Sequence, residues 1–274
     1  MGDNVEHKTE KLKVLDRDAV KYIAIFFMFW GHLFSWLTLM RNHGISDPYE
    51  WMPWWQGLLS HASLLCPPVM FFMITDGYKY THDRKKYAVR LLIFACITQI
   101  PDWMCFLHVY GWWTSNVIFT LFFGLLAIIA WESKLRKWQR ILLVILCSGA
   151  TLAMSAAWEI FGVLLIFVLH VYRDRPKARL ISYSVVAFVW KGLAVMWQLI
   201  GGTFDIAAIY HDTLDLVFVM LGYVLVAVFC NGKKGKHPVF GKWFFYIFYP
   251  VHYLIIWLIF ILTPMAAPFL FYDF

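Results

Sequence analysis

Long apolar runs, separated by short polar or basic loops, occupy almost the whole of this sequence and restrict what it can fold into. A helix needs about 20 apolar residues to cross the ~30 Å hydrocarbon layer of a bilayer. The pattern therefore predicts an all-α, polytopic helical membrane protein with about nine transmembrane helices, within a range of 8–10. The runs cover about residues 18–40, 58–77, 88–107, 116–131, 141–156, 158–172, 180–199, 213–230 and 243–263.

The composition argues against the other main classes of protein. Hydrophobic residues make up 61% and charged residues 15% of the 274 residues, whereas soluble domains average about 45–50% and about 25%. A soluble enzyme or a disordered chain is therefore not expected, and the runs are too long for the alternating strands of a membrane β-barrel. We expect a polar cytoplasmic arm over residues 1–13 and one integral-membrane bundle over residues 14–274. The fifth and sixth runs are short and could form one re-entrant hairpin.

The basic residues alternate between loops and so predict an orientation. Of the 24 lysines and arginines, all but Arg41 and Lys191 fall in the N-terminal segment or the even-numbered loops. Cytoplasmic loops carry an excess of these residues. The pattern places the N-terminus in the cytoplasm and the C-terminus outside, in a multi-pass protein of the cell membrane. The same pattern explains the net charge of +7 without a nucleic-acid partner, and the expected surroundings of the helices are the lipid bilayer.

Two histidines lie deep inside predicted spans, where ionisable groups are costly and mark candidate functional sites. His32 follows an apolar run in the first span and lies 15 residues after Arg17, which is about 22 Å along a helix. His252 follows Pro250 in the ninth span, where proline is expected to kink the helix. Either histidine can be a hydrogen-bond partner between helices or part of a catalytic site.

Four other residues have a structural and a functional interpretation. Asp76 ends the second span and either pairs with the basic cluster at residues 84–90 or takes part in function. Lys191 lies near the middle of the seventh span and needs a partner or a water-filled cavity. Asn116 is the expected N-cap of the fourth span. Glu159 lies between two short apolar runs, where a simple helix-end role is less obvious.

The basic residues at the predicted cytoplasmic face also have two interpretations. Arg17 and Lys21 open the first helix and can contact lipid head groups or bind a phosphate. Lys86 and Arg90 belong to a loop whose charges follow from topology alone. The sequence lacks the motifs of ATP-binding loops, dinucleotide folds, serine hydrolases and zinc proteases. Its five cysteines have no metal-ligand spacing, so no metal site is expected.

A set of short stretches follows one order through most of the chain: Leu15-Asp16-Arg17 with the span that ends in His32; Asp76-Gly77-Tyr78, Lys86-Tyr87 and residues 90–95; Gln99-Ile100-Pro101; residues 116–121; residues 161–165; Asn231-Gly232 with Gly235; and residues 244–252. Together these stretches resemble the TraX family of membrane proteins, whose namesake N-acetylates conjugative pilin. That family is similar, more distantly, to membrane acyltransferases that use acyl-CoA. This sequence departs from the family pattern at Gly31, where an acidic residue often precedes the first-span histidine. A carboxylate that orients His32 must then come from elsewhere.

The resemblance implies transfer of an acetyl or other acyl group from cytosolic acetyl-CoA to an amine, such as a peptide N-terminus, or to a hydroxyl. The acceptor would be a peptide, a glycan or a lipid-linked molecule. On this hypothesis the catalytic residues are His32, His252, Asp76 and Lys191; the CoA phosphates bind Arg17, Lys21, Lys86 and Arg90; and the substrate or oxyanion contacts Asn116, Tyr249 and Glu159. The alternative is a small proton-coupled secondary transporter, which would also use buried His, Lys and Asp residues.

Overall fold

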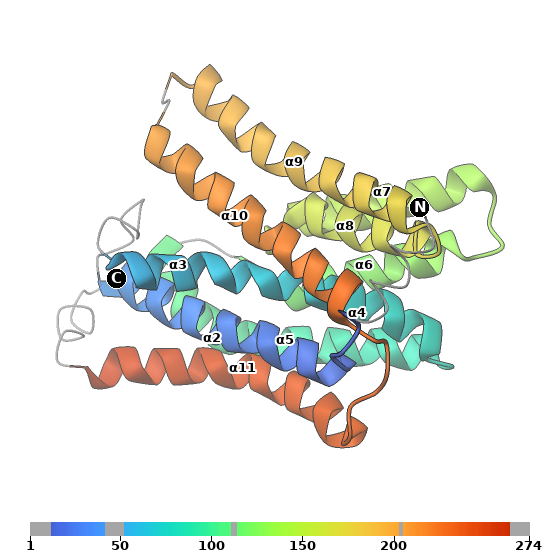
Figure 1. Cartoon of the computed structure of the whole chain (residues 1–274), viewed down its shortest axis with the longest axis horizontal. Helices are drawn as coiled ribbons and strands as arrows, with labels where there is room; N and C mark the ends of the chain where they lie inside the picture. The colour runs from blue at the N-terminus through green and yellow to red at the C-terminus, as the bar shows by residue number, and fades with distance from the viewer. Residues whose placement is uncertain (1–11, 42–51, 111–113, 203–204, 264–274) are drawn as a thin grey trace.

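The computed structural model describes residues 12–41, 52–110, 114–202 and 205–263, and within these ranges the regular structure is helical (Figure 1). The prediction of an all-α fold is confirmed. The helices are α2 (Arg17–Arg41), α3 (Trp54–Ala62), η2 (Ser63–Leu65), α4 (Cys66–Tyr80), α5 (Arg84–Tyr110), α6 (Val117–Trp131), α7 (Lys137–Ala153), α8 (Glu159–Val171), α9 (Pro176–Ile200), α10 (Ile206–Val224), η3 (Leu225–Phe229) and α11 (Pro238–Leu262).

Six helical segments in the described part of the chain are long and apolar enough to cross a membrane. The helices α6, α7 and α8, which lie between the third and fourth of these segments in the chain, are shorter, with 15, 17 and 13 residues. They coincide with the fourth, fifth and sixth apolar runs of the sequence. The crossing segments are Arg17–Met40, Trp54–Tyr80, Arg84–Cys105, Pro176–Ile200, Ile206–Phe229 and Val239–Leu262. The polar arm expected at residues 1–13 lies almost entirely outside the described residues.

The second crossing segment is continuous although it contains two prolines. Helix α3 passes through the short 3₁₀ helix η2 into α4. Pro67 and Pro68 occupy the first positions of α4, where a missing backbone N–H group breaks few helical hydrogen bonds. The change of helix type at η2 lets α3 and α4 form one segment against α2.

Helix α2 packs closely on this segment through a single glycine. A Cβ atom at Gly31 would lie 2.5 Å from Ser63 Cβ and 2.7 Å from the Leu59 carbonyl oxygen. Small residues at such crossings let two membrane helices approach each other. Gly222 of α10 allows a similar approach, because a Cβ atom added there would lie 2.7 Å from the Leu65 carbonyl oxygen. The helices around α3 and η2 are therefore held together by backbone proximity.

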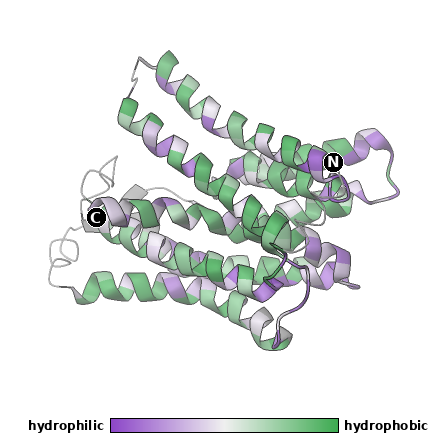
Figure 2. Ribbon diagram, viewed as in Figure 1, coloured by the Kyte–Doolittle hydropathy of each residue, from purple (hydrophilic) through white to green (hydrophobic). Residues whose placement is uncertain are grey.

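Hydrophobic residues predominate along the helices, and hydrophilic residues gather at the end of the bundle where the α6–α7 turn and the η3–α11 connection lie (Figure 2). Only 11% of the residues in the most apolar stretch of helix α9 are buried. The exposed side chains of this helix are large and apolar, such as those of Ile181, Val185 and Phe188. A surface of this kind suits contact with lipid. The polytopic helical membrane architecture predicted from the sequence is confirmed.

The close approach at Gly31 leads to a prediction for stability. Gly31→Ala places a methyl group against the backbone of α3, so it should destabilise the fold by about 1–3 kcal/mol through overpacking. Gly192→Ala is the matched control, because no atom lies within 4 Å of its new Cβ and alanine favours a helix. Thermal unfolding in detergent should show a lower apparent Tm for Gly31→Ala only. Equal Tm values for the two variants would contradict this packing.

Candidate active site

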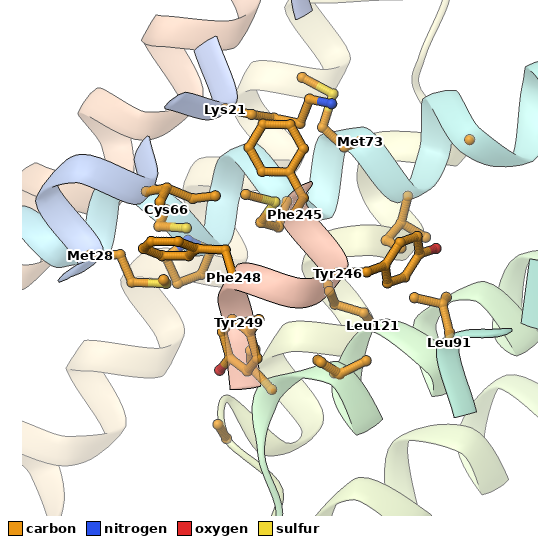
Figure 3. A pocket seen from close by; sticks show the side chains of 18 of the residues that line it. Lys21, Met28, Cys66, Met73, Leu91, Leu121, Phe245, Tyr246, Phe248 and Tyr249 are labelled. Carbon is orange, nitrogen blue, oxygen red and sulfur yellow. The ribbon is translucent and has the colours of Figure 1, made fainter. Parts of the chain in front are cut away.

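A cavity of about 640 Å³ lies inside the bundle, enclosed mainly by α2, α4, α5, α6 and α11 (Figure 3). Its α2 wall follows directly from the sequence, because side chains three or four positions apart share one face of a helix. That wall runs from the start of the helix into its second half through Arg17, Lys21, Ile25, Met28, His32 and Trp36. The cavity therefore extends along α2 from a basic end to a histidine.

Charged side chains occur at the end of the cavity where α2 begins. Arg17 Nε lies 2.9 Å from Asp76 Oδ2, and Lys21 Nζ lies 2.6 Å from Asp18 Oδ1. Arg90 enters from α5 and lies over the ring of Tyr246, 5.8 Å from its centroid. The sequence left open whether Asp76 forms an ion pair or takes part in function. It does form an ion pair, but its partner is Arg17 rather than the basic cluster at residues 84–90. The two ion pairs neutralise themselves and Arg90 leaves a net positive charge, which suits an anionic ligand.

Polarizable and aromatic side chains form the middle of the cavity. Lys21 and Met73 lie near Phe245, and Phe248 and Tyr249 lie further along (Figure 3). Methionine side chains are flexible and fit irregular apolar ligands, and Met28 and Met70 line this section as well. This part of the cavity offers a ligand contact without charge.

Two histidines meet at the deep end of the cavity. His32 Nδ1 lies 3.2 Å from His252 Nε2, and the two side chains come from α2 and α11. His252 is fully buried and its ring stacks on Phe248, with centroids 5.7 Å apart, whereas His32 is partly exposed and lines the cavity. In this hydrogen bond one nitrogen donates and the other accepts. Packing therefore fixes the His252 ring, and His32 is the member of the pair that can meet a ligand.

The tautomer of this pair decides whether His32 can act as a base. The contact between the two rings allows either tautomer, because one nitrogen donates and the other accepts, and His252 Nδ1 has no hydrogen-bond partner among the described residues. In the tautomer in which His32 Nδ1 donates to His252 Nε2, a lone pair is left on His32 Nε2, which is the requirement for a general base.

A tyrosine hydroxyl lies beside the histidines. The Tyr249 hydroxyl interacts with the backbone N–H of Val117, at the first turn of α6, and lies 3.5 Å from the Tyr253 hydroxyl. The amino end of a helix carries partial positive charge. The Tyr249 hydroxyl, which lines the cavity, is therefore placed to donate a hydrogen bond to a developing negative charge.

A buried carboxyl group reaches the site through Tyr253. Asp102 is buried and forms side-chain hydrogen bonds with Tyr253 and with Gln99, whose Nε2 lies 3.2 Å from Asp102 Oδ2. The Tyr253 ring in turn stacks on His32, with centroids 5.8 Å apart. Asp102 was not among the residues predicted for the site. The available signal was the spacing of Gln99 and Asp102, which puts both side chains on one face of a helix.

A strained segment forms another part of the cavity wall. Trp158 has a φ of 69°, and its neighbours Ser155 and Glu159 have φ values of 45° and 39°. Such conformations are costly for residues other than glycine and occur often at functional sites. Trp158 lines the cavity, and its ring packs on Trp190 with centroids 4.5 Å apart. This conformation could not be predicted from the sequence, because none of these positions is a glycine.

Four residues predicted for the site lie outside the cavity lining. Asn116 is the expected N-cap, since its Oδ1 accepts from the Ile118 amide at 3.0 Å, and its Nδ2 donates to Ala95 and Gln99. Glu159 is exposed in the first turn of α8. Lys86 is also exposed and pairs with Asp83 at 3.3 Å; the backbone amide of Lys86 lowers the pKa of the Asp83 carboxyl. Lys191 pairs with Asp212 and Asp215.

The described residues contain no group of three or more His, Cys, Asp or Glu side chains that could hold a metal ion. The chemical groups that remain at the cavity are cations at one end, an apolar middle, and a histidine base with a tyrosine donor at the other end. Such a site can bind a long anionic molecule and remove a proton near the far end of that molecule.

Comparison with known proteins identifies relatives over most of the chain. The family model described as TraX protein matches residues 16–260. The probable fimbrial assembly protein FimC, serogroup H1, of Dichelobacter nodosus is 32% identical over 215 residues, which cover 73% of this chain and 81% of that protein. No solved structure matches the chain.

The Arg17–Asp76 pair leads to a second prediction. Both side chains are mostly buried, at 15% exposure each, so Arg17→Met should leave an uncompensated carboxylate and lower stability by about 1–3 kcal/mol. The double variant Arg17→Met with Asp76→Asn should recover part of that loss. Lys86→Met is the control, because Lys86 is 85% exposed and exposed pairs contribute little. Additive single and double losses in a thermal-unfolding cycle would show that the pair is not coupled.

Proposed function

The chain belongs to the TraX protein family, and from this membership and the geometry of the cavity we propose that it is a membrane-embedded acetyltransferase. It moves an acetyl group from cytosolic acetyl-CoA to an amine, with the N-terminus of a peptide or protein as acceptor. The similarity to a probable fimbrial assembly protein favours a protein subunit of a surface fibre as the molecule that carries this amine.

One observation carries the proposal: the cavity has cations at one end and a histidine base at the other. Arg17 and His32 are 15 residues apart on the same face of α2, a separation of about 22 Å along the helix. A ligand that fills this space must be long and narrow, with phosphates at one end and a reactive group at the other. Acyl-CoA has this form, because its phosphates and its thioester are separated by the pantetheine arm.

The proposal also sets the orientation. CoA is cytosolic, so the basic end of the cavity faces the cytoplasm, as the distribution of Lys and Arg between loops predicts. The N-terminus is then cytoplasmic and the C-terminus lies outside. On this view α6, α7 and α8 complete a set of nine membrane-crossing helices, and their short lengths require a locally thinner bilayer.

The reaction uses the groups at the deep end of the cavity. The acceptor nitrogen attacks the thioester carbonyl carbon, His32 Nε2 takes a proton from that nitrogen, and the Tyr249 hydroxyl donates a hydrogen bond to the carbonyl oxygen. The C–N bond forms as the C–S bond breaks. The sulfur leaves and takes the proton from His32, so that an amide and CoA thiol are the products. His252 holds the base in its tautomer.

The residues beyond His32 favour this function over the proton-coupled transporter that the sequence also allowed. Side chains of α2 and α11 pack together there with little exposed surface and form an apolar plug: Leu33, Trp36, Leu39, Met40, Ile256 and Phe260. A transporter needs a path that alternates between the two faces. A closed apolar end instead protects a thioester from water.

Separate variants at the two ends of the cavity test the proposal. His32→Gln should reduce acetyl transfer by about 10²–10⁴-fold and leave the Kd for acetyl-CoA unchanged, because it removes the base and no phosphate contact. Arg90→Gln should raise the Kd about 10-fold or more, since a charge-assisted contact is lost. Release of CoA thiol with peptides that carry a free N-terminus gives the rate, and radiolabelled acetyl-CoA gives the Kd. Near-normal turnover in His32→Gln would exclude this mechanism.

Tyr249→Phe tests the oxyanion donor. The variant loses a hydroxyl that is expected to act only as charge develops, so kcat should fall by about 10–10³-fold while KM changes little. Tyr246→Phe is the control, because Tyr246 lines the cavity beside Arg90 and away from the histidines. Equal kcat values for the two variants would remove Tyr249 from the reaction.

A further inference from the structure

The connection between η3 and α11, residues 230–237, is attached to the start of α2. Both lie at the same end of the bundle (Figure 1), where hydrophilic residues gather (Figure 2). Three backbone hydrogen bonds join them: the Leu15 amide to the Phe229 carbonyl at 3.0 Å, the Asn231 amide to the Leu15 carbonyl at 2.8 Å, and the Arg17 amide to the Lys233 carbonyl at 3.0 Å. The backbone of Lys233 is therefore held beside Arg17, which lines the cavity.

The basic end of the cavity is its mouth. The lining there includes Tyr80, which is 59% exposed and whose ring centroid lies 4.5 Å from the guanidinium carbon of Arg17. A molecule that reaches from His32 past Arg17 therefore leaves the cavity next to the connection.

Glycines keep the connection close to the first turn of α2. A Cβ atom at Gly235 would collide with the Asp18 carboxylate, and one at Gly241, in α11, would lie 2.8 Å from Asp18 Oδ2. Gly232 has a φ of 70°, a conformation that glycine adopts without steric cost. These contacts give the connection a defined path beside the mouth.

The connection carries three lysines with exposed side chains, Lys233, Lys234 and Lys236. Within the part of the chain that the structure describes, none of the three forms an ion pair. The carboxylates at the start of α2 and the end of α4 already have other partners: Asp16 Oδ1 accepts from the Ala19 amide at 2.8 Å, Asp18 pairs with Lys21, and Asp76 pairs with Arg17. The three ammonium groups can therefore bind an anion from outside the chain.

We propose that Lys233, Lys234 and Lys236 bind the 3′-phosphate of CoA outside the cavity and so select acetyl-CoA over donors that lack this group. The inference rests on the proposed function. In CoA the diphosphate lies between the pantetheine arm and the ribose that carries the 3′-phosphate. With the thioester at His32 and the diphosphate at Arg17, the ribose extends past the start of α2 to the connection.

The charge of the 3′-phosphate suits this site. A phosphate monoester carries about −1.5 to −2 charges at pH 7, and lysine binds phosphate as a flexible point charge. Lipid head groups present the same phosphate chemistry to basic residues at a membrane surface. The two sources differ in one respect, because only binding of the 3′-phosphate makes the affinity for acetyl-CoA depend on that group.

The test compares acetyl-CoA with 3′-dephospho-acetyl-CoA on the full-length protein in phosphatidylcholine nanodiscs. Radiolabelled acetyl-CoA gives one Kd, and its displacement gives the other. Wild-type protein should bind acetyl-CoA about 10-fold or more tightly than the dephospho form, since charge-assisted hydrogen bonds to one phosphate are lost. In the triple variant Lys233→Gln, Lys234→Gln and Lys236→Gln the two Kd values should become similar, near the wild-type value for the dephospho form.

A second triple variant is the matched control. Lys134→Gln, Arg136→Gln and Lys137→Gln remove the same charge from exposed residues of the α6–α7 turn, at the same end of the bundle (Figure 2), and should keep the wild-type ratio of Kd values. Both comparisons are made at one salt concentration, because exposed charges are screened.

The possible failures are distinguishable. Acetyl-CoA binding with a ratio near one in the wild type, or with a ratio that persists when the three connection lysines are changed, would overturn this proposal alone. If the triple variant instead weakens only binding to vesicles that contain phosphatidic acid, the lysines bind lipid phosphate and the proposal is wrong. A protein that binds neither donor would overturn the acetyltransferase function together with this inference.

Discussion

Ionised side chains in hydrocarbon need a counter-charge or hydrogen bonds, and this requirement determines how the helices of the bundle are joined. Arg17 of α2 pairs with Asp76 of α4, and Lys191 of α9 pairs with Asp212 and Asp215 of α10. Each pair connects two helices that apolar contacts alone could hold in several registers. A buried polar ring also needs a hydrogen-bond partner, and this brings the neutral rings of His32 and His252 together across α2 and α11, a contact that creates the candidate active site.

Gly31 shows how packing and chemistry act on the same helix. At the position before His32, the backbone of α3 leaves no room for a side chain. The support for His32 comes from His252, and from Asp102 through Tyr253. The base is thus oriented by groups on α11 and α5, which a close α2–α3 contact does not disturb.

The sequence predicted features that depend on one helix, and it missed those that depend on two. The apolar runs indicated the helices, the cap at Asn116 was correct, and the spacing along the first span placed His32 about 22 Å from Arg17. The partner of Asp76 could not be found this way, because neighbours in sequence pointed to residues 84–90 while packing brought Arg17. His32 and His252 are 220 positions apart, so each was a candidate but their contact was not predictable.

The measurement that tests the acyl-CoA site most directly is the thermal stability of the purified protein as a function of acetyl-CoA concentration. A ligand that binds only the folded state raises the apparent Tm progressively above its Kd. The account predicts that acetyl-CoA raises the Tm, that desulfo-CoA does so less, and that ATP, which lacks the pantetheine arm, does not. An unchanged Tm at saturating acetyl-CoA, with the protein folded, would contradict it.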